Sequence, residues 1–173
     1  YIGSSDHNLY ALDTTSGDLQ WVFETGDTVY SPTVVDGTVY IGNNDNNLYA
    51  VNATSGDQQW AFEADNWVGP PAVANGTIFV GSGDHKVYAV DGASGERHWT
   101  FETDRRVSPH PVVSNGTVHV GSWDNNVYAI DAVSGDQRWN FRTDDRVVAS
   151  PAVVDGTVYV GSTDGDLYAL SGE

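Results

Sequence analysis

The chain of 173 residues contains no cysteine and carries a net charge of −17, from 24 acidic and 7 basic side chains. This length suits a single domain with its own core, and without cysteine neither disulfides nor thiolate metal sites can form. A strongly negative surface repels nucleic acid and acidic membranes, so neither is an expected partner. No apolar run is long enough for a membrane-spanning helix, so we expect no direct membrane insertion.

The acidic surface also bears on the source of the protein. Lys86 is the single lysine of the chain. Acidic side chains in place of lysine are typical of halophilic hosts, where a Debye length of about 3 Å at molar salt weakens self-repulsion. The alternative is an acidic extracellular domain from an ordinary host. Disorder is not favoured, because 12% of the residues are aromatic and the apolar residues are regularly spaced.

The chain consists of repeats. The pattern Ala-x-(Asp/Asn)-x-x-Ser-Gly-(Asp/Glu)-x-x-Trp ends at tryptophans spaced 39, 39 and 40 residues apart, namely Trp21, Trp60, Trp99 and Trp139. A further copy begins at Ala169. A fixed period of about 40 residues indicates a stack of one supersecondary unit. The predicted units, of which the first and last are partial, are residues 1–28, 29–67, 68–106, 107–146 and 147–173.

Each complete unit predicts four strands. In the second unit they are expected at residues 29–35, 38–42, 47–51 and 58–63. Asp36-Gly37, between the first two strands, is typical of a type I′ hairpin turn. Pro32 cannot donate to a ladder, which places the first strand at a sheet edge, beside a central channel. We therefore predict an all-β fold: a β-propeller of four-stranded antiparallel blades, with about four and a half blades in this chain.

The repeated tryptophans are expected in the seams between blades, where an indole can bury its ring while its N–H finds a carbonyl. The repeat resembles the tryptophan-docking motif of pyrroloquinoline-quinone (PQQ) enzyme repeats, which form the blades of quinoprotein-dehydrogenase-like β-propellers. The resemblance covers essentially the whole chain. It implies a structural docking role for Trp21, Trp60, Trp99 and Trp139.

The same blades also build non-catalytic propellers, among them a lipoprotein of the outer-membrane barrel-assembly machine and extracellular domains of some receptor kinases. The resemblance therefore implies a scaffold rather than a reaction. We favour the non-catalytic branch that is similar to the barrel-assembly lipoprotein.

The ends of the repeat raise the question of how the ring closes. The chain begins on the second strand of one blade and ends on the third strand of another. Members of the family that the chain resembles usually close with about seven or eight blades. We therefore expect an arc of a longer propeller, completed by a missing segment or by a second copy. A five-bladed ring with two incomplete blades is the remaining alternative.

Binding is expected where the units differ. Two sets of loops vary: the joining loops between blades, and the loops between second and third strands. An up-and-down blade places both sets on one face, which we call the variable-loop face. The joining loops include residues 26–28, 65–67, 104–106 and 144–146. The second set is residues 5–8, 44–47, 83–86, 123–126 and 163–166.

Trp67 and Trp123 are the tryptophans outside the docking motif, and both fall in these loops. They could stack on a flat ligand or anchor a partner peptide. The alternative is that each packs over its own loop.

A basic group also stands out in this acidic chain. It consists of Arg105, Arg106, His110 and Arg146. Guanidinium groups bind carboxylates and other anions in bidentate fashion, so the group is a candidate anion site. The alternative is that the arginines form ion pairs with Asp104, Asp144 and Asp145.

One aspartate recurs in every loop between second and third strands. These residues are Asp6, Asp45, Asp84, Asp124 and Asp164. Carboxylates beside asparagines suit calcium, but no loop has the alternating ligand spacing of a calcium-binding loop. An Asx turn that closes the hairpin is the better interpretation, so we predict no metal site. His119 takes the aromatic position of Tyr40, Phe79 and Tyr159, and is expected in the core.

We therefore predict a non-catalytic scaffold without catalytic residues or cofactor. It would bind a protein, peptide or surface ligand through the variable-loop face. One alternative is a fragment of a PQQ- and calcium-dependent quinoprotein dehydrogenase, although the vicinal cysteine pair of many quinoprotein alcohol dehydrogenases cannot exist here. Another is the extracellular sensor domain of a membrane kinase or lipoprotein. We expect an extracellular or cell-surface location, with no targeting segment in this chain.

Overall fold

The computed structural model describes residues 1–108 and 110–171. Within these ranges every regular element is a β-strand, and the strands form five antiparallel sheets. The first sheet consists of β1 (Ile2–Gly3), β2 (Asn8–Leu12) and β3 (Leu19–Glu24). The second consists of β4 (Thr33–Val35), β5 (Thr38–Gly42), β6 (Asn47–Asn52) and β7 (Gln58–Glu63).

The remaining sheets repeat this plan. The third consists of β8 (Ala72–Ala74), β9 (Thr77–Gly81), β10 (Lys86–Asp91) and β11 (Arg97–Glu102). The fourth consists of β12 (Val112–Ser114), β13 (Thr117–Gly121), β14 (Asn126–Asp131) and β15 (Gln137–Arg142). The fifth consists of β16 (Ala152–Val154), β17 (Thr157–Gly161) and β18 (Leu167–Ser171).

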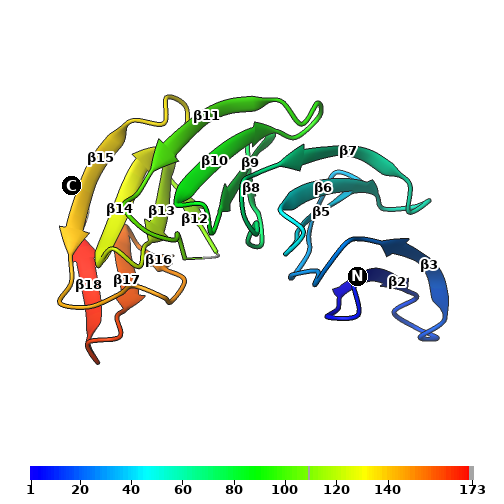
Figure 1. The fold of residues 1–173 in the computed structure, drawn as a ribbon, viewed down its shortest axis with the longest axis horizontal. Coiled ribbons are helices and arrows are strands. Elements are labelled where there is room, and N and C mark those ends of the chain that lie inside the picture. The colour runs from blue at the N-terminus through cyan, green and yellow to red at the C-terminus, as the bar shows by residue number, and fades with distance from the viewer. Residues whose placement is uncertain (109, 172–173) are drawn as a thin grey trace.

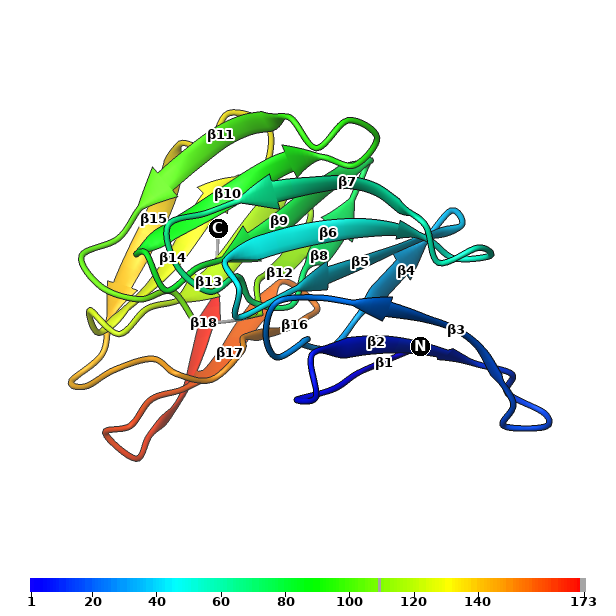
Figure 2. The ribbon, with the colours of Figure 1, turned by 45° about the vertical axis from the view of Figure 1, so that its right-hand side comes forward.

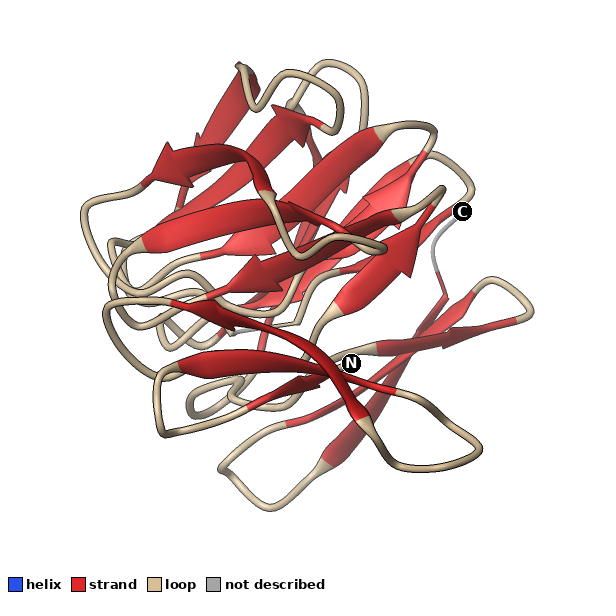
Figure 3. Ribbon diagram, turned by 90° about the vertical axis from the view of Figure 1, so that its right-hand side faces the viewer, coloured by secondary structure: helices blue, strands red, loops and turns tan. Residues whose placement is uncertain are grey.

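The sheets follow one another in an arc, from the blue first sheet to the orange and red last sheet (Figure 1). The short first strands of the later sheets form the inner edge, where β8 contacts both β4 and β12, and β12 contacts β16. Figures 2 and 3 show the same stack of strands and loops from two further sides. The prediction of an all-β propeller with four-stranded antiparallel blades is confirmed. The first and last sheets lie at opposite ends of the arc, so the described residues form an open fan rather than a closed five-sheet ring.

The turn chemistry explains the hairpins and corrects one predicted strand. Asp36 and Gly37 both have positive φ, 48° and 78°, as the type I′ turn requires. The strand expected at residues 29–35 is shorter, because β4 begins only at Thr33. Pro32 offers no N–H to the ladder, and before it Val29 makes only an isolated bridge with Asn43.

Each seam between neighbouring sheets has its own core of aliphatic side chains. Leu9 of the first sheet packs with Ile41 and Val51 of the second, and all three are fully buried. Similar clusters fill the following seams. A sheet thus buries its faces against its neighbours, which is how repeat proteins obtain their stability.

The repeated tryptophans lie across these seams. The Nε1–H of Trp21 donates to the carbonyl of Ala53 in the next sheet at 3.1 Å. Its ring rests on Gly56, where an added Cβ would lie 2.8 Å from the indole. Trp60 and Trp99 donate in the same way, to the carbonyls of Gly92 and Ala132.

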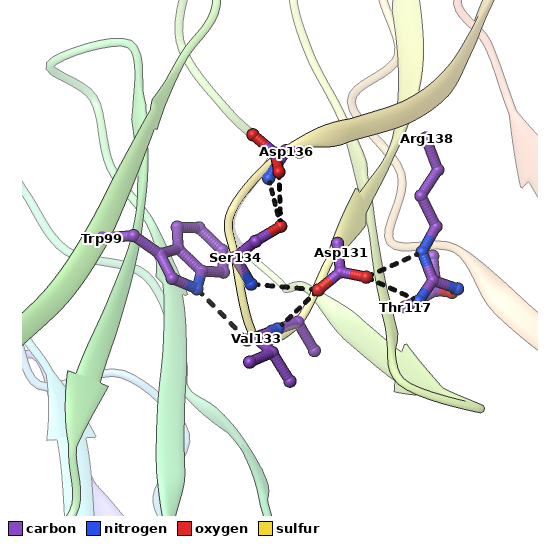
Figure 4. A network of polar contacts seen from close by, with 8 residues as sticks. Trp99, Thr117, Asp131, Val133, Ser134, Asp136 and Arg138 are labelled. Carbon is purple, nitrogen blue, oxygen red and sulfur yellow. Dashed lines mark hydrogen bonds and ion pairs between the residues drawn. The ribbon is translucent and has the colours of Figure 1, made fainter.

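Figure 4 shows this contact for Trp99, whose partner turn is built around Asp131. For Trp139 the position that corresponds to Ala132 is residue 172, which lies outside the described residues. Trp139 itself packs with Val127, Val147 and Val160.

Candidate functional site

Both sets of variable loops lie on one face and are joined by the backbone. The N–H of Trp123, between β13 and β14, donates to the carbonyl of Arg106 in the joining loop before β12, at 2.9 Å. Equivalent bonds recur from Gly83 to Trp67 and from Thr163 to Arg146. The fold therefore brings one variable position of each joining loop next to one variable position of the loop between second and third strands.

At one such place two arginines gather over an indole. The guanidinium carbon Cζ of Arg106 lies 5.4 Å from the ring centroid of Trp123, and that of Arg146 lies 5.3 Å from it. Arg106 enters the fourth sheet and Arg146 enters the fifth, so the group crosses the seam between them. Both arginines are exposed and Trp123 is half-buried. We call Arg106, Trp123 and Arg146 the Arg–Trp cluster.

The ion pairs expected for these arginines are absent. The ion pairs between described residues are Lys86–Asp65, His98–Asp91 and Arg138–Asp131. The carboxylate of Asp145 instead accepts the backbone N–H of its neighbour Arg146 at 2.8 Å. The alternative interpretation, in which Arg105, Arg106 and Arg146 pair with Asp104, Asp144 and Asp145, is therefore not supported among the described residues. The backbone holds Asp145 within its own loop, while Arg106 and Arg146 stack over the indole.

The recurring aspartates form the predicted Asx turns and also make hydrogen bonds that the sequence did not predict. Asp45 Oδ1 accepts the N–H of Asn47 at 3.1 Å, which is the predicted Asx turn. Its Oδ2 accepts the Tyr49 hydroxyl at 2.8 Å and the N–H of Gly26, in the preceding joining loop, at 2.8 Å. Asp84, Asp124 and Asp164 repeat these bonds to a tyrosine and to the preceding loop.

These bonds also explain the electrostatics of the loops. Burial, and then the bond to the aspartate, raises the pKa of Tyr49, Tyr88 and Tyr128 well above the ordinary phenol value. A tyrosine four residues after the aspartate in each unit was the signal in the sequence that could have predicted the pair. Because N–H and O–H donors already occupy these carboxylates, they are poor candidates for metal ligands. Across the ranges that the structure covers, no group of three or more His, Cys, Asp or Glu side chains could hold a metal ion.

Comparison with known families identifies the repeat. The family described as "Outer membrane protein assembly factor BamB" matches residues 1–66 and 64–173. The chain belongs to the BamB family. No curated protein matches it.

Solved structures support the same fold. BamB from Moraxella catarrhalis superposes with a TM-score of 0.85 at 22% identity, over 98% of this chain and 54% of that one. The computationally designed Ika8 protein gives a TM-score of 0.89 at 14% identity, again over 98% and 54%. The designed Ika4 protein gives 0.76 at 14% identity, over 83% of this chain and 90% of that one. The chain thus spans about half the length of BamB and Ika8, and at these identities the likeness shows the fold alone.

In this BamB-family chain the other predicted site residues lie apart from the Arg–Trp cluster. Trp67 lies in an earlier joining loop, makes an edge contact with Tyr30 at 6.4 Å and covers Gly83. Trp67 therefore contacts the start of its own unit at Tyr30 and the next unit at Gly83. Arg105 is exposed, and its carbonyl accepts hydrogen bonds from the hydroxyls of Thr103 and Ser122. His110 is exposed, and partial desolvation lowers the pKa of its imidazole.

A separate groove lies on the opposite side of the BamB-type sheets. It has a volume of about 700 Å³ and is lined by strand residues such as Phe79 and His98 and by turn residues such as Asn115 and Val133. None of its lining residues belongs to the Arg–Trp cluster. The arginines of the cluster are exposed, and an exposed site of this kind suits a macromolecular partner better than an enclosed small molecule.

Proposed function

We propose that this chain is part of a non-catalytic propeller scaffold that binds a protein partner through its variable-loop face. The Arg–Trp cluster carries the proposal, because it presents an indole and two arginines without ion pairs among the described residues. Aromatic and arginine side chains dominate the binding energy of protein interfaces. The family, described as an assembly factor, also supports a scaffold role. The chain covers about half of the solved relatives, so the function of a whole protein belongs to the proposal.

A quinoprotein dehydrogenase is the alternative function, and the residues present do not fit it. PQQ enzymes need a calcium ion held by oxygen ligands, with a carboxylate base beside it. The recurring carboxylates here accept backbone N–H and tyrosine O–H donors in the same way in each unit. Catalysis needs one unit that differs from the others. The departures at the Arg–Trp cluster are arginine and tryptophan side chains, which offer calcium no oxygen ligand.

The other expectations become part of the same proposal. We assign a structural docking role to the four repeated tryptophans. A further segment, or a second copy, would complete the ring.

The family description favours a location outside the cytoplasm. Within the described residues there is no helix that could cross a membrane. The acidic surface remains consistent with a high-salt host.

Site-specific photocrosslinking in the producing cells tests the proposed function. A photoreactive phenylalanine analogue would replace Arg105 or Thr163, which are exposed on the variable-loop face and lie outside the Arg–Trp cluster, and Val133, which is 87% exposed at the opposite side, as the control. We expect one protein to crosslink from the first two positions and not from the third. Crosslinks from Val133 alone, or from no position, would overturn the proposal. Dye-linked oxidation of alcohols or sugars after addition of PQQ and calcium would instead support the dehydrogenase.

A further inference from the structure

The Arg–Trp cluster leaves its hydrogen-bonding capacity unused. The contact of each guanidinium with the indole is a cation–π contact, which does not use the N–H donors of the arginine. Among the described residues no side-chain nitrogen of Arg106 or Arg146 donates a hydrogen bond to the protein, unlike Arg138, which binds Asp131 and Thr117. Two forked donors are therefore available at one surface point.

The distribution of charge indicates which kind of ligand the N–H groups of these arginines would bind. The chain has 7 basic side chains against 24 acidic ones. Most of the basic ones belong to the joining loops beside the cluster or to the end of β15, namely Arg105, Arg106, Arg142 and Arg146. Two like charges over one ring repel each other, so a bound anion would relieve a cost that the free protein carries. The rest of the surface is mostly acidic and would repel an anion, so the anion would bind at the Arg–Trp cluster.

We propose that the Arg–Trp cluster is a clamp for an acidic peptide segment of the partner protein. Each guanidinium would bind one Asp or Glu carboxylate in bidentate fashion, and the indole of Trp123 would cover the apolar part of the segment. The two arginines come from consecutive joining loops, so they suit carboxylates spaced along an extended peptide. The inference rests on the proposed function, because it names the chemistry of that partner.

Fluorescence anisotropy with a labelled peptide of alternating Glu and Gly tests the clamp, with the matched Gln and Gly peptide as control. We expect the Glu peptide to bind, and binding to weaken as salt increases. Arg106→Gln with Arg146→Gln, and separately Trp123→Ala, should each weaken binding at least about tenfold. Arg97→Gln removes an exposed charge on β11, outside the joining loops, and should leave binding unchanged. Circular dichroism at each salt concentration would show that every variant is folded.

Three results would overturn the clamp. These are equal binding of the Gln peptide, an unaffected double arginine variant, and displacement of the Glu peptide by inorganic phosphate at equal concentration, which would indicate a general anion site. The photocrosslinking experiment separates this failure from failure of the proposed function. If crosslinks form from the variable-loop face but the peptide does not bind, only the clamp is wrong. If the peptide binds but no crosslink forms, the cluster still binds acidic peptides, but the proposed function is wrong, and with it the assignment of the peptide to a partner protein.

Discussion

Asp45 accepts the backbone N–H of Gly26 at 2.8 Å, so a carboxylate of the second sheet holds the loop that leaves the first. The same side chain accepts Asn47 N–H and the Tyr49 hydroxyl, at 3.1 and 2.8 Å. One half-buried carboxylate therefore closes its own hairpin and links two sheets. Since the arrangement recurs in the following units, it contributes to every seam of the arc.

Replacement of this carboxylate should weaken the fold. In Asp45→Ala four donors, including the side-chain amide of Asn47, lose their acceptor, and we expect the free energy of unfolding to fall by about 2 kcal/mol. Urea denaturation followed by tryptophan fluorescence would measure it. Asp18→Ala is the matched control, because Asp18 is exposed and its carboxylate accepts no hydrogen bond from a described residue. An equal loss in both variants would contradict the role of Asp45.

The contact between Trp21 and Gly56 can be separated from backbone strain. Gly37 and Gly56 have the same φ of 78°, but an added Cβ at Gly37 meets nothing within 4 Å, whereas at Gly56 it lies 2.8 Å from the indole. Gly37→Ala should cost about 1 kcal/mol from the left-handed conformation alone. Gly56→Ala should cost clearly more, because the indole must also move.

A double-mutant cycle assigns the additional cost. In a Trp21→Ala background the ring that meets the new methyl group is gone, so Gly56→Ala should cost no more than Gly37→Ala. Thermal and urea unfolding of the single and double variants would measure this coupling. If the cost of Gly56→Ala is the same with and without the indole, the seam contact is not what makes the glycine necessary.

The fold was predictable because its signals are local and repeated. The pair Asp36-Gly37 specifies a turn by its own backbone preference, and the period of the tryptophans specifies the stack. The length of β4 was not predicted, because the sequence did not show whether the strand continues through Pro32. β-Branched residues occur on both sides of this proline and favour a strand. Counting the strands in the sequence predicted an arc. Its open shape depends on how the sheets pack at each seam.

The candidate site was only partly predictable. Arg106, Trp123 and Arg146 lie far apart in the sequence, and residue type alone indicated them. Whether an arginine stacks on an indole or pairs with a carboxylate depends on side-chain directions within loops, which the repeat does not specify. Asp145 shows the difficulty, because its carboxylate accepts the backbone N–H of Arg146 rather than the guanidinium of that residue.

His119 should impose a pH dependence on stability. It is 7% exposed, its ring lies 5.7 Å from that of Trp139, and its Nδ1 has no hydrogen-bond partner among the described residues. Burial, and then the charge of Arg138, lowers the pKa of His119. The unfolded chain therefore binds the proton more readily, and stability should fall as the pH drops below about 6.5, the unperturbed histidine value.

The variant His119→Phe tests this, since Phe79 fills the same position in the preceding unit. It should gain about 1 kcal/mol at neutral pH through removal of a buried polar group. It should also lose the part of the pH dependence below about 6.5. Urea unfolding between neutral and mildly acidic pH would show both effects.

Asp131 should stabilise the fold only in its ionised form. The N–H groups of Ser134 and Val133 and the guanidinium of Arg138 donate to its carboxylate, and these bonds hold the pKa of Asp131 well below its usual value. Since the folded pKa is depressed, the stabilisation is present above the unfolded value of about 4 and is lost as the pH falls further. Asp131→Asn keeps the turn, as Asn52 does in the second unit, but removes the charge. We therefore expect it to be less stable than the parent at pH 7, with a difference that shrinks on acidification below about 4. Paired urea titrations across this range would measure the difference, and one that stays constant with pH would contradict the ionic contribution.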